Sequence, residues 1–186
     1  MLIEGISHPE AARSATPGLP ASQPDVRWYA AYTCAHHEKQ VSRQLAERRI
    51  DCFLPLYRSV RRWKDRRKEV QLALFPGYVF VHIGAQERLR VLQIPRVVRF
   101  VSFSGRPSPL DDNEIESLRN GVTKGVWAEP HPYLKAGRRV RVTRGPLAGA
   151  EGILVRKKDK FRVVISIHII MRSVAVEVDQ ADVEAC

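Results

Sequence analysis

The stretch LFPGYVFVHI (residues 74–83) combines two patterns that seldom occur together. Buried strands are rich in β-branched residues and avoid proline and glycine, whereas turns that contain Pro-Gly are seldom surrounded by aromatic side chains. Here Pro76 and Gly77 are followed directly by an apolar run that contains Tyr78 and Phe80. The stretch therefore predicts a turn that leads into a strand whose aromatic side chains face a large apolar surface.

Composition limits the class of protein. The chain has 186 residues, of which 44% are hydrophobic, so it can build one ordinary domain or two small ones. Its formal net charge of +11 and its isoelectric point near 10.1 favour a polyanionic partner. We expect a cytoplasmic protein without membrane attachment, because no apolar run approaches the ~18 residues of a membrane span and the N-terminus lacks a signal-peptide pattern. Three cysteines without a CxxC pair argue against a disulfide framework and a zinc site.

The charges are distributed unevenly along the chain. Residues 27–100 contain 16 basic and six acidic residues, and residues 134–186 contain 11 basic and six acidic residues. The segment between them is slightly acidic, and Gly and Pro recur over residues 121–133. This distribution predicts two modules, 27–120 and 134–186, joined by a linker. Residues 1–26 contain four prolines and no periodic pattern, so we expect a disordered tail.

The first module alternates strand and helix patterns. The expected strands are 27–33, 50–57, 74–83 and 97–103, and the expected helices are 35–49, 86–93 and 111–121. Thr33 or Cys34 would cap the first helix, and Asp111 would cap the last, which would end at Gly121. The order strand, helix, strand, strand, helix, strand predicts a ferredoxin-like α/β sandwich.

The second module changes to a period of two residues, which is typical of strands. The alternating apolar positions are Val140 and Val142, Ile153 and Val155, Val163, Ile165 and Ile167, and Val174, Val176 and Val178. Turn signals separate these runs, so the sequence predicts a small β-barrel of five strands. The whole chain is then an α+β protein.

Motifs in both modules resemble the NusG family of transcription elongation factors. The Trp28-Tyr29 strand start, a basic hairpin and the LFPGYVFV run are similar to the N-terminal (NGN) domain of that family. The stretch KAGRRVRVTRGPLAGAEGILV (135–155) is similar to the KOW motif, which implies an SH3-like barrel. Its signature positions here are Val140, Val142, Gly145, Pro146, Gly149 and Gly152. The resemblance covers residues 27–186.

The resemblance implies a binding surface for RNA polymerase. In the family, the FPGY segment helps to form an aromatic surface that grips the paired clamp helices of the β′ subunit. The corresponding residues here are Trp28, Tyr29, Phe75, Pro76, Gly77, Tyr78 and Phe80. Rigid aromatic side chains suit such helix recognition because they bury a large area at low entropic cost. The alternative for each of these aromatics is a purely internal packing role.

The segment RSVRRWKDRRK (58–68) is a candidate nucleic-acid contact, because seven of its eleven residues are basic. Its candidate residues are Arg58, Arg61, Arg62, Trp63, Lys64, Arg66, Arg67 and Lys68. Trp63 could stack on an unpaired base. The resemblance places this side near the upstream DNA fork and the non-template strand, and nascent RNA is a further partner to consider. The alternative is a solvated loop that protects an edge strand.

A third candidate is the polar face of the first helix. Gln40, Gln44 and Arg48 recur four residues apart and therefore share one face. Specialised members of the family read bases of the non-template strand from this helix, and Gln44 and Arg48 suit base edges chemically. An ordinary solvated helix face is the commoner explanation of such a pattern.

The barrel departs from the usual family pattern in two places. Leu147 stands where the general factor often has an aromatic residue, in the loop that meets the termination factor Rho or a small-subunit ribosomal protein. The turn SIHIIMRS (166–173) lacks a glycine and is apolar. This turn could be a partner surface or could pack against the first module.

No motif indicates catalysis, a cofactor or a metal site, so we expect a binding protein rather than an enzyme. The residues of these motifs most resemble those of specialised NusG paralogs of the RfaH and UpxY type. The sequence therefore predicts a monomeric elongation and antitermination factor that suppresses pausing on selected operons. Two alternatives stay open: a housekeeping factor that couples polymerase to Rho or the ribosome, and a KOW-type RNA-binding or ribosomal module. The target operon, its recruiting signal and any refolding of the barrel are also open.

Overall fold

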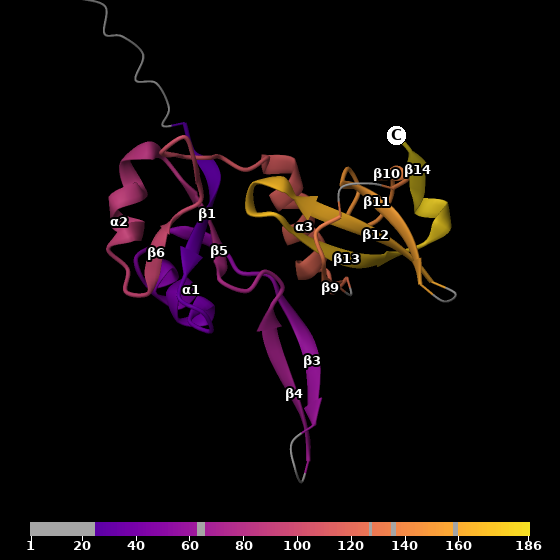
Figure 1. Cartoon of the computed structure of the whole chain (residues 1–186), viewed down its shortest axis with the longest axis horizontal. Helices are drawn as coiled ribbons and strands as arrows, with labels where there is room; N and C mark the ends of the chain where they lie inside the picture. The colour runs from indigo at the N-terminus through magenta and orange to yellow at the C-terminus, as the bar shows by residue number, and fades with distance from the viewer. Residues whose placement is uncertain (1–24, 63–65, 127, 135–136, 158–159) are drawn as a thin grey trace, which may run out of the picture.

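The computed structural model describes residues 25–62, 66–126, 128–134, 137–157 and 160–186. Most of the expected tail (1–26) lies outside the described residues, as do Trp63 and Lys64. Two modules lie side by side, and a hairpin projects away from both of them (Figure 1).

The first module is built on a four-stranded antiparallel sheet. Its strands are β1 (Arg27–Thr33), β2 (Asp51–Phe53), β5 (Tyr78–Ile83) and β6 (Val97–Phe100), and their order across the sheet is β2-β5-β1-β6. With α1 (Glu38–Glu47) between the first two strands and α2 (Arg88–Leu92) before the last, this order confirms the predicted ferredoxin-like sandwich. The 3-10 turn η1 (Ala85–Glu87) leads into α2.

The first helix is shorter than the sequence predicts. It begins after His37, whose side chain makes no capping hydrogen bond, and not after the expected cap Thr33 or Cys34. His36 has a φ of +64°, so the chain turns sharply before the helix can start. At the other end Arg49 has a φ of +58°, which stops the helix before the expected residue. The expected range 35–49 is therefore wrong by several residues at its start.

Two hairpins extend the first module. Strands β3 (Leu56–Arg62) and β4 (Arg67–Ala73) form the long hairpin that projects in Figure 1. Strands β7 (Ser102–Phe103) and β8 (Arg106–Pro107) form a short one after β6. The expected continuous strand 97–103 is thus interrupted at Val101, where the chain leaves the sheet.

The second module contains β10 (Arg139–Val142), β11 (Glu151–Lys157), β12 (Lys160–Ile167), β13 (Arg172–Val178) and β14 (Val183–Ala185). The short turns η2 (His168–Ile170) and η3 (Gln180–Asp182) connect the last of these strands. An additional strand, β9 (Ala128–His131), pairs with β13, which gives the order β14-β10-β11-β12-β13-β9. The segment expected as a linker (121–133) therefore contains a strand of this sheet.

The helix α3 (Asp112–Thr123) connects the two modules. Asp111 caps it as predicted, because its Oδ1 accepts hydrogen bonds from the backbone N–H groups of Asn113 (2.8 Å) and Glu114 (3.3 Å). The expected end at Gly121 is wrong, since the helix continues to Thr123. Gly121 serves a packing role instead: a Cβ at this position would lie 2.4 Å from Cδ2 of Leu147 in the barrel.

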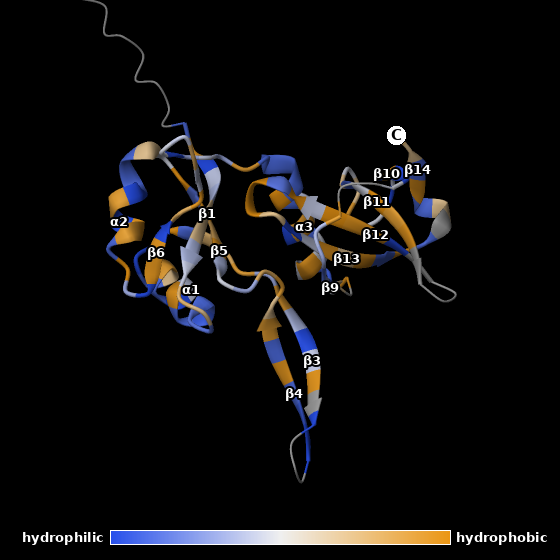
Figure 2. Ribbon diagram, in the orientation of Figure 1, coloured by the Kyte–Doolittle hydropathy of each residue, from blue (hydrophilic) through white to orange (hydrophobic). Residues whose placement is uncertain are grey.

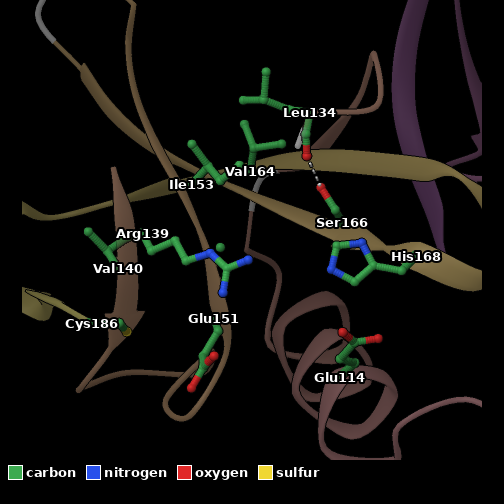
Figure 3. A pocket seen from close by; sticks show the side chains of 11 residues that line it. Glu114, Leu134, Arg139, Val140, Glu151, Ile153, Val164, Ser166, His168 and Cys186 are labelled. Atoms are coloured by element: carbon green, nitrogen blue, oxygen red, sulfur yellow. Dashed lines mark hydrogen bonds between the residues drawn. The ribbon is translucent and has the colours of Figure 1, made fainter. Parts of the chain in front are cut away.

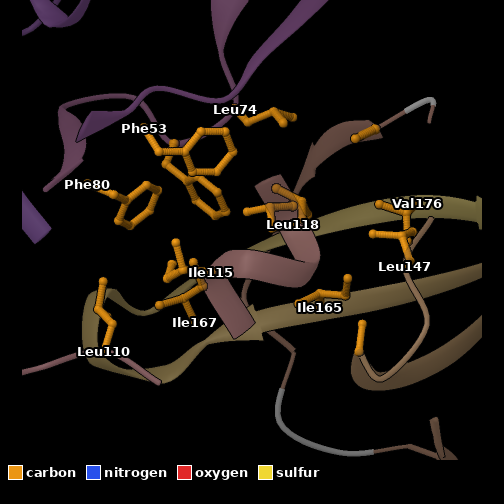
Figure 4. Packing of buried hydrophobic residues seen from close by; sticks show 14 of the residues in the cluster. Phe53, Leu74, Phe80, Leu110, Ile115, Leu118, Leu147, Ile165, Ile167 and Val176 are labelled. Carbon is orange, nitrogen blue, oxygen red and sulfur yellow. The ribbon is translucent and has the colours of Figure 1, made fainter. Parts of the chain in front are cut away.

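One apolar cluster runs through both modules, with α3 at its centre (Figure 4). The sheet contributes Trp28, Phe53 and Phe80, α3 contributes Ile115 and Leu118, and the barrel contributes Leu147, Ile165, Ile167 and Val176. A second, smaller cluster lies on the other face of the sheet, under α1 and α2. The modules therefore share a core through α3. Among the described helices none is long and apolar enough to cross a membrane.

The close contact between α3 and the barrel predicts the effect of a side chain at Gly121. Gly121→Val should lower the free energy of unfolding by about 1–3 kcal/mol, because Leu147 must move out of a packed site. Urea unfolding measures this change, and Asn120→Val, at an exposed position of the same helix turn, is the control. Because Leu147→Ala makes room, the double variant should lose less than the sum of the single losses. Strictly additive losses of unfolding free energy would contradict a contact between positions 121 and 147.

Candidate functional site

The FPGY segment forms a tight turn. The backbone N–H of Tyr78 donates to the carbonyl of Phe75 at 3.1 Å, and Gly77 has a φ of +84°. Proline in the second position and a positive φ in the third are typical of a type II turn, which explains why Pro76 is followed by glycine. A Cβ at Gly77 would also approach the Tyr32 ring to 3.2 Å. The turn thus requires Pro76 and Gly77, the two residues that are unusual in a strand-forming apolar run.

A buried carboxylate holds this turn in place. Oε1 of Glu38, at the start of α1, accepts hydrogen bonds from the backbone N–H groups of Gly77 (2.7 Å) and His36 (3.3 Å). The carbonyl of Gly77 accepts from the N–H of Thr33 at 2.8 Å. Only 7% of Glu38 is exposed. Glu38 was not among the residues predicted to be functional, although an acidic residue in the first turn of the helix is a visible signal in the sequence.

The residues predicted to bind polymerase do not share one exposed surface. Trp28, Phe75 and Phe80 lie almost completely buried in the cluster that α3 covers, and the rings of Phe75 and Phe80 meet edge to face at 5.4 Å. Tyr29 lies on the opposite face of the sheet, because neighbouring residues of a strand alternate. There its hydroxyl accepts a hydrogen bond from Arg88 at 3.1 Å.

An aromatic surface lies where β1 ends and β5 begins. The rings of Tyr32 and Tyr78 are 5.5 Å apart, and 37% of Tyr32 is exposed. The guanidinium of Arg99 lies 5.6 Å from the centre of the Tyr32 ring, and Pro76 is exposed in the adjoining turn. We call Tyr32, Pro76, Tyr78 and Arg99 the tyrosine edge. Tyr32 was missed, although alternation within 27–33 places it on the same face as Trp28.

Polar contacts fasten α3 to the sheet beside the buried aromatics. The indole N–H of Trp28 donates to Glu116 at 3.2 Å, and Arg119 forms an ion pair with Asp51 at 3.2 Å. The guanidinium of Arg119 also lies 5.5 Å from the centre of the Trp28 ring. None of these contacts involves a residue of the barrel, so they join α3 directly to the sheet.

The predicted basic hairpin forms, and its strands pair from Leu56↔Ala73 to Arg62↔Arg67. It becomes more hydrophilic toward its tip (Figure 2). Among its predicted contact residues, the structure places Arg58, Arg62, Arg66, Arg67 and Lys68 at exposed positions. Arg58 forms an ion pair with Glu69 at 3.4 Å. Trp63, Lys64 and the side chain of Arg61 lie outside the described part of the chain.

The polar face of α1 is partly occupied by contacts within the fold. Arg48 donates to the carbonyl of Arg90 at 3.3 Å, and Arg90 donates to the carbonyl of Arg48 at 3.0 Å. Gln44 is half-buried, and its Oε1 has no hydrogen-bond partner among the described residues. Gln40 is exposed.

The KOW motif supplies the loop that meets α3. Val140 and Val142 are buried in the barrel, and Gly145 and Gly149 have φ values of +81° and +89° at the two ends of the loop. Between them, Leu147 is only 3% exposed because it packs on Gly121. Pro146 is half-buried beside it, and Gly152 lets β11 approach β12 closely, since a Cβ there would lie 2.5 Å from Val163.

The apolar turn of the barrel divides between the core and the surface. Ile167 and Ile170 are buried in the shared cluster, whereas Ile169 and Met171 are exposed. Met171 has a φ of +52°, which provides the sharp turn that the sequence achieves without glycine. The sequence left two alternatives for this turn, a partner surface or packing against the first module. The structure shows packing into the shared cluster for Ile167 and Ile170, and leaves Ile169 and Met171 exposed.

A pocket lies between α3 and the barrel (Figure 3). It is lined by Glu114 of α3 and by Arg139, Glu151, Ser166 and His168 of the barrel. Burial, and then the charges of Asp111 and Glu151, raise the pKa of Glu114 to about 7. Among the described residues no group of three or more His, Cys, Asp or Glu side chains could hold a metal ion.

Residues 26–119 match the family model described as transcription termination factor NusG, and this segment is slightly more than half of the chain. The chain belongs to the NusG family. It is 28% identical over 172 residues to the transcription termination/antitermination protein NusG of Pseudomonas aeruginosa, a match that covers 85% of this chain and 97% of the relative. It is 29% identical over 175 residues to the NusG protein of Escherichia coli K12, with 87% and 97% covered.

The fold agrees with a solved NusG structure. The structure described as showing domain interaction in Thermotoga maritima NusG superposes with a TM-score of 0.54 at 22% identity, over 86% of this chain and 97% of that one. This similarity supports the two-module architecture of the NusG family. The family match and the relatives named above make the chain a NusG-type transcription factor.

The buried carboxylate in this NusG-family chain predicts a loss of stability when it is removed. Glu38→Ala should lower the free energy of unfolding by about 1–3 kcal/mol, because two backbone N–H groups would lose their acceptor. Urea unfolding measures the loss, and Glu47→Ala, exposed on the same helix, is the control. An equally small loss of unfolding free energy in Glu38→Ala and Glu47→Ala would show that Glu38 does not hold the turn.

The raised pKa of Glu114 predicts how stability depends on pH. Between pH 4.5 and about 7 the folded chain holds this proton more tightly than the unfolded chain, so stability falls as pH rises through that range. Glu114→Gln should therefore raise Tm by a few degrees at pH 8, where the carboxylate is charged, and leave Tm unchanged at pH 4. Thermal unfolding followed by circular dichroism measures both values. Glu184→Gln, exposed on β14, is the control, and an equal shift at both pH values would contradict the assignment.

Proposed function

We propose that this NusG-family protein binds RNA polymerase through the tyrosine edge and suppresses pausing or termination on selected operons. The observation that carries the proposal is the ring pair of the exposed Tyr32 and the half-buried Tyr78 beside a conformationally fixed turn. The proposed target is the pair of clamp helices in the β′ subunit of the polymerase.

Rigidity supports this assignment. Glu38 and Thr33 fix the turn, so the tyrosine rings lose little conformational freedom when a partner binds. Tyrosine supplies apolar contact area and a hydroxyl that stays hydrated, which suits the side of an amphipathic helix. The buried residues Trp28, Phe75 and Phe80 support this surface from beneath, so their predicted contribution is to position it.

The β3–β4 hairpin is proposed to contact DNA. It projects away from both modules and presents Arg62, Arg66 and Arg67 at exposed positions near its tip. Guanidinium groups in this arrangement suit phosphates, and their contribution should fall as salt rises. With the clamp helices bound at the tyrosine edge, the hairpin would reach toward upstream DNA or the non-template strand.

The barrel is proposed to recruit a further partner only after it leaves α3. Leu147 sits in the loop expected to meet Rho or a ribosomal protein, and its side chain is covered in the docked arrangement. A covered loop supports a factor that acts at chosen sites over one that couples polymerase to Rho or the ribosome continuously. The Thermotoga maritima structure, whose description names a domain interaction, is consistent with such docking.

Direct binding of the full chain to core RNA polymerase tests the proposal. Tyr78→Ala should weaken binding roughly thirtyfold, about 2 kcal/mol, because it removes an anchor from the centre of the surface. Tyr133→Ala, in the barrel, is the matched control and should bind within about twofold of wild type.

Two outcomes would contradict the proposal. Wild-type affinity of Tyr78→Ala would exclude the tyrosine edge as the polymerase contact. Absence of polymerase binding by the wild-type chain, together with tight RNA binding, would favour a KOW-type RNA-binding module instead.

A further inference from the structure

The short β7–β8 hairpin presents an aromatic side chain that the fold does not use. Phe103 is 80% exposed, which is the largest exposed fraction among the large hydrophobic side chains that the structure describes. Exposure of a whole phenyl ring to water is unfavourable by about 2 kcal/mol compared with burial. A partner that covers the Phe103 ring would therefore gain this free energy on binding.

Backbone geometry holds the ring in place. Ser104 and Gly105 connect Phe103 to Arg106 with φ values of +49° and +76°, the pattern of a two-residue type I′ hairpin turn. The hairpin is anchored to β1 on both sides, because the N–H of Val101 donates to Ala30 at 2.9 Å and the N–H of Leu110 donates to Trp28 at 2.8 Å. The exposed ring of Phe103 is therefore held on a hydrogen-bonded hairpin that is itself bonded to β1.

A guanidinium lies beside the ring. Arg106 is the cross-strand partner of Phe103, so both side chains leave the same face of the hairpin with Cβ atoms about 5 Å apart. Arg106 is exposed, so its guanidinium is available beside the ring. From Arg88 to Leu110 the chain contains five arginines and no acidic residue.

An exposed ring and a guanidinium in this arrangement suit single-stranded nucleic acid. Unpaired bases stack on aromatic side chains, and the phosphates that flank them pair with arginine. In a duplex the bases already stack on each other, so the ring would have no free base to contact. The hairpin itself (residues 102–107) contains no acidic residue, and the acidic residues that follow it, Asp111 and Asp112, cap and begin α3.

We propose that Phe103 and Arg106 form a binding site for an unpaired nucleobase and its phosphate. This site is distinct from the β3–β4 hairpin, and it does not depend on polymerase binding at the tyrosine edge. The predicted ligand is a single strand of DNA or RNA, and the site provides stacking and charge without reading base identity.

The test uses fluorescence anisotropy with the full chain, a labelled oligothymidine of about 12 nucleotides and a duplex of equal length. Phe103→Ala and Phe103→Leu should both weaken single-strand binding roughly five- to a hundredfold, while duplex binding stays unchanged. Phe103→Trp should retain or strengthen it, because indole stacks at least as well as phenyl. Leu89→Ala, exposed on α2, is the matched control and should behave as wild type.

Arg106→Gln should reduce the slope of the logarithm of affinity against the logarithm of salt concentration by about one phosphate contact. A variant with Arg62, Arg66 and Arg67 all changed to Gln tests whether the two sites are separate. When this triple change is combined with Phe103→Ala, the two losses of binding free energy for the single strand should add, because the effects of distant, independent sites are additive. Additive losses would support a second site even if polymerase binding at the tyrosine edge failed.

Three results would overturn the inference. One is wild-type affinity of Phe103→Ala for the single strand. Another is full retention of single-strand binding by Phe103→Leu, which would indicate simple apolar contact without stacking. The third is an equal loss for single strand and duplex in Phe103→Ala.

Discussion

Leu147 packs on the backbone of Gly121, and this contact joins the barrel to the rest of the molecule. A Cβ at position 121 would lie 2.4 Å from Cδ2 of Leu147, so a larger residue there would require the Leu147 side chain to move. Glycine lowers helix stability by roughly 0.8–1.0 kcal/mol relative to alanine, so its place inside α3 is explained by tertiary packing. Because Ile115 and Leu118 of the same helix lie in the cluster that the sheet and the barrel share, α3 packs against both modules.

This arrangement separates surfaces that are covered from surfaces that are available. The KOW loop is covered while the barrel is docked, whereas the tyrosine edge, the β3–β4 hairpin and the β7–β8 hairpin all present exposed side chains. The ion pair of Arg119 with Asp51 and the hydrogen bond of Trp28 with Glu116 hold α3 on the sheet. The side chains of Leu147 and Glu114 lie between α3 and the barrel, whereas the tyrosine edge lies outside that contact.

Much of the architecture could be predicted from the sequence because local patterns determine it. The β-prone apolar runs 27–33 and 74–83 and the order of the elements were sufficient for the ferredoxin-like sheet, and the period of two was sufficient for the barrel. The end of α3, the strand β9 and the burial of Leu147 were not predictable in this way, since each depends on a partner that lies elsewhere in the chain. The sequence grouped Trp28 and Tyr29 on one surface, whereas the structure places them on opposite faces of the sheet, because adjacent residues of a strand alternate.

The docked arrangement is tested most directly by nuclear Overhauser effects between the methyl protons of Leu147 and the Hα protons of Gly121. In a full-length sample with methyl-labelled leucine, strong cross-peaks between these groups are expected at neutral pH, together with one common rotational correlation time for both modules. Absence of these cross-peaks, with separate correlation times for residues 27–123 and 128–186, would contradict a core shared through α3.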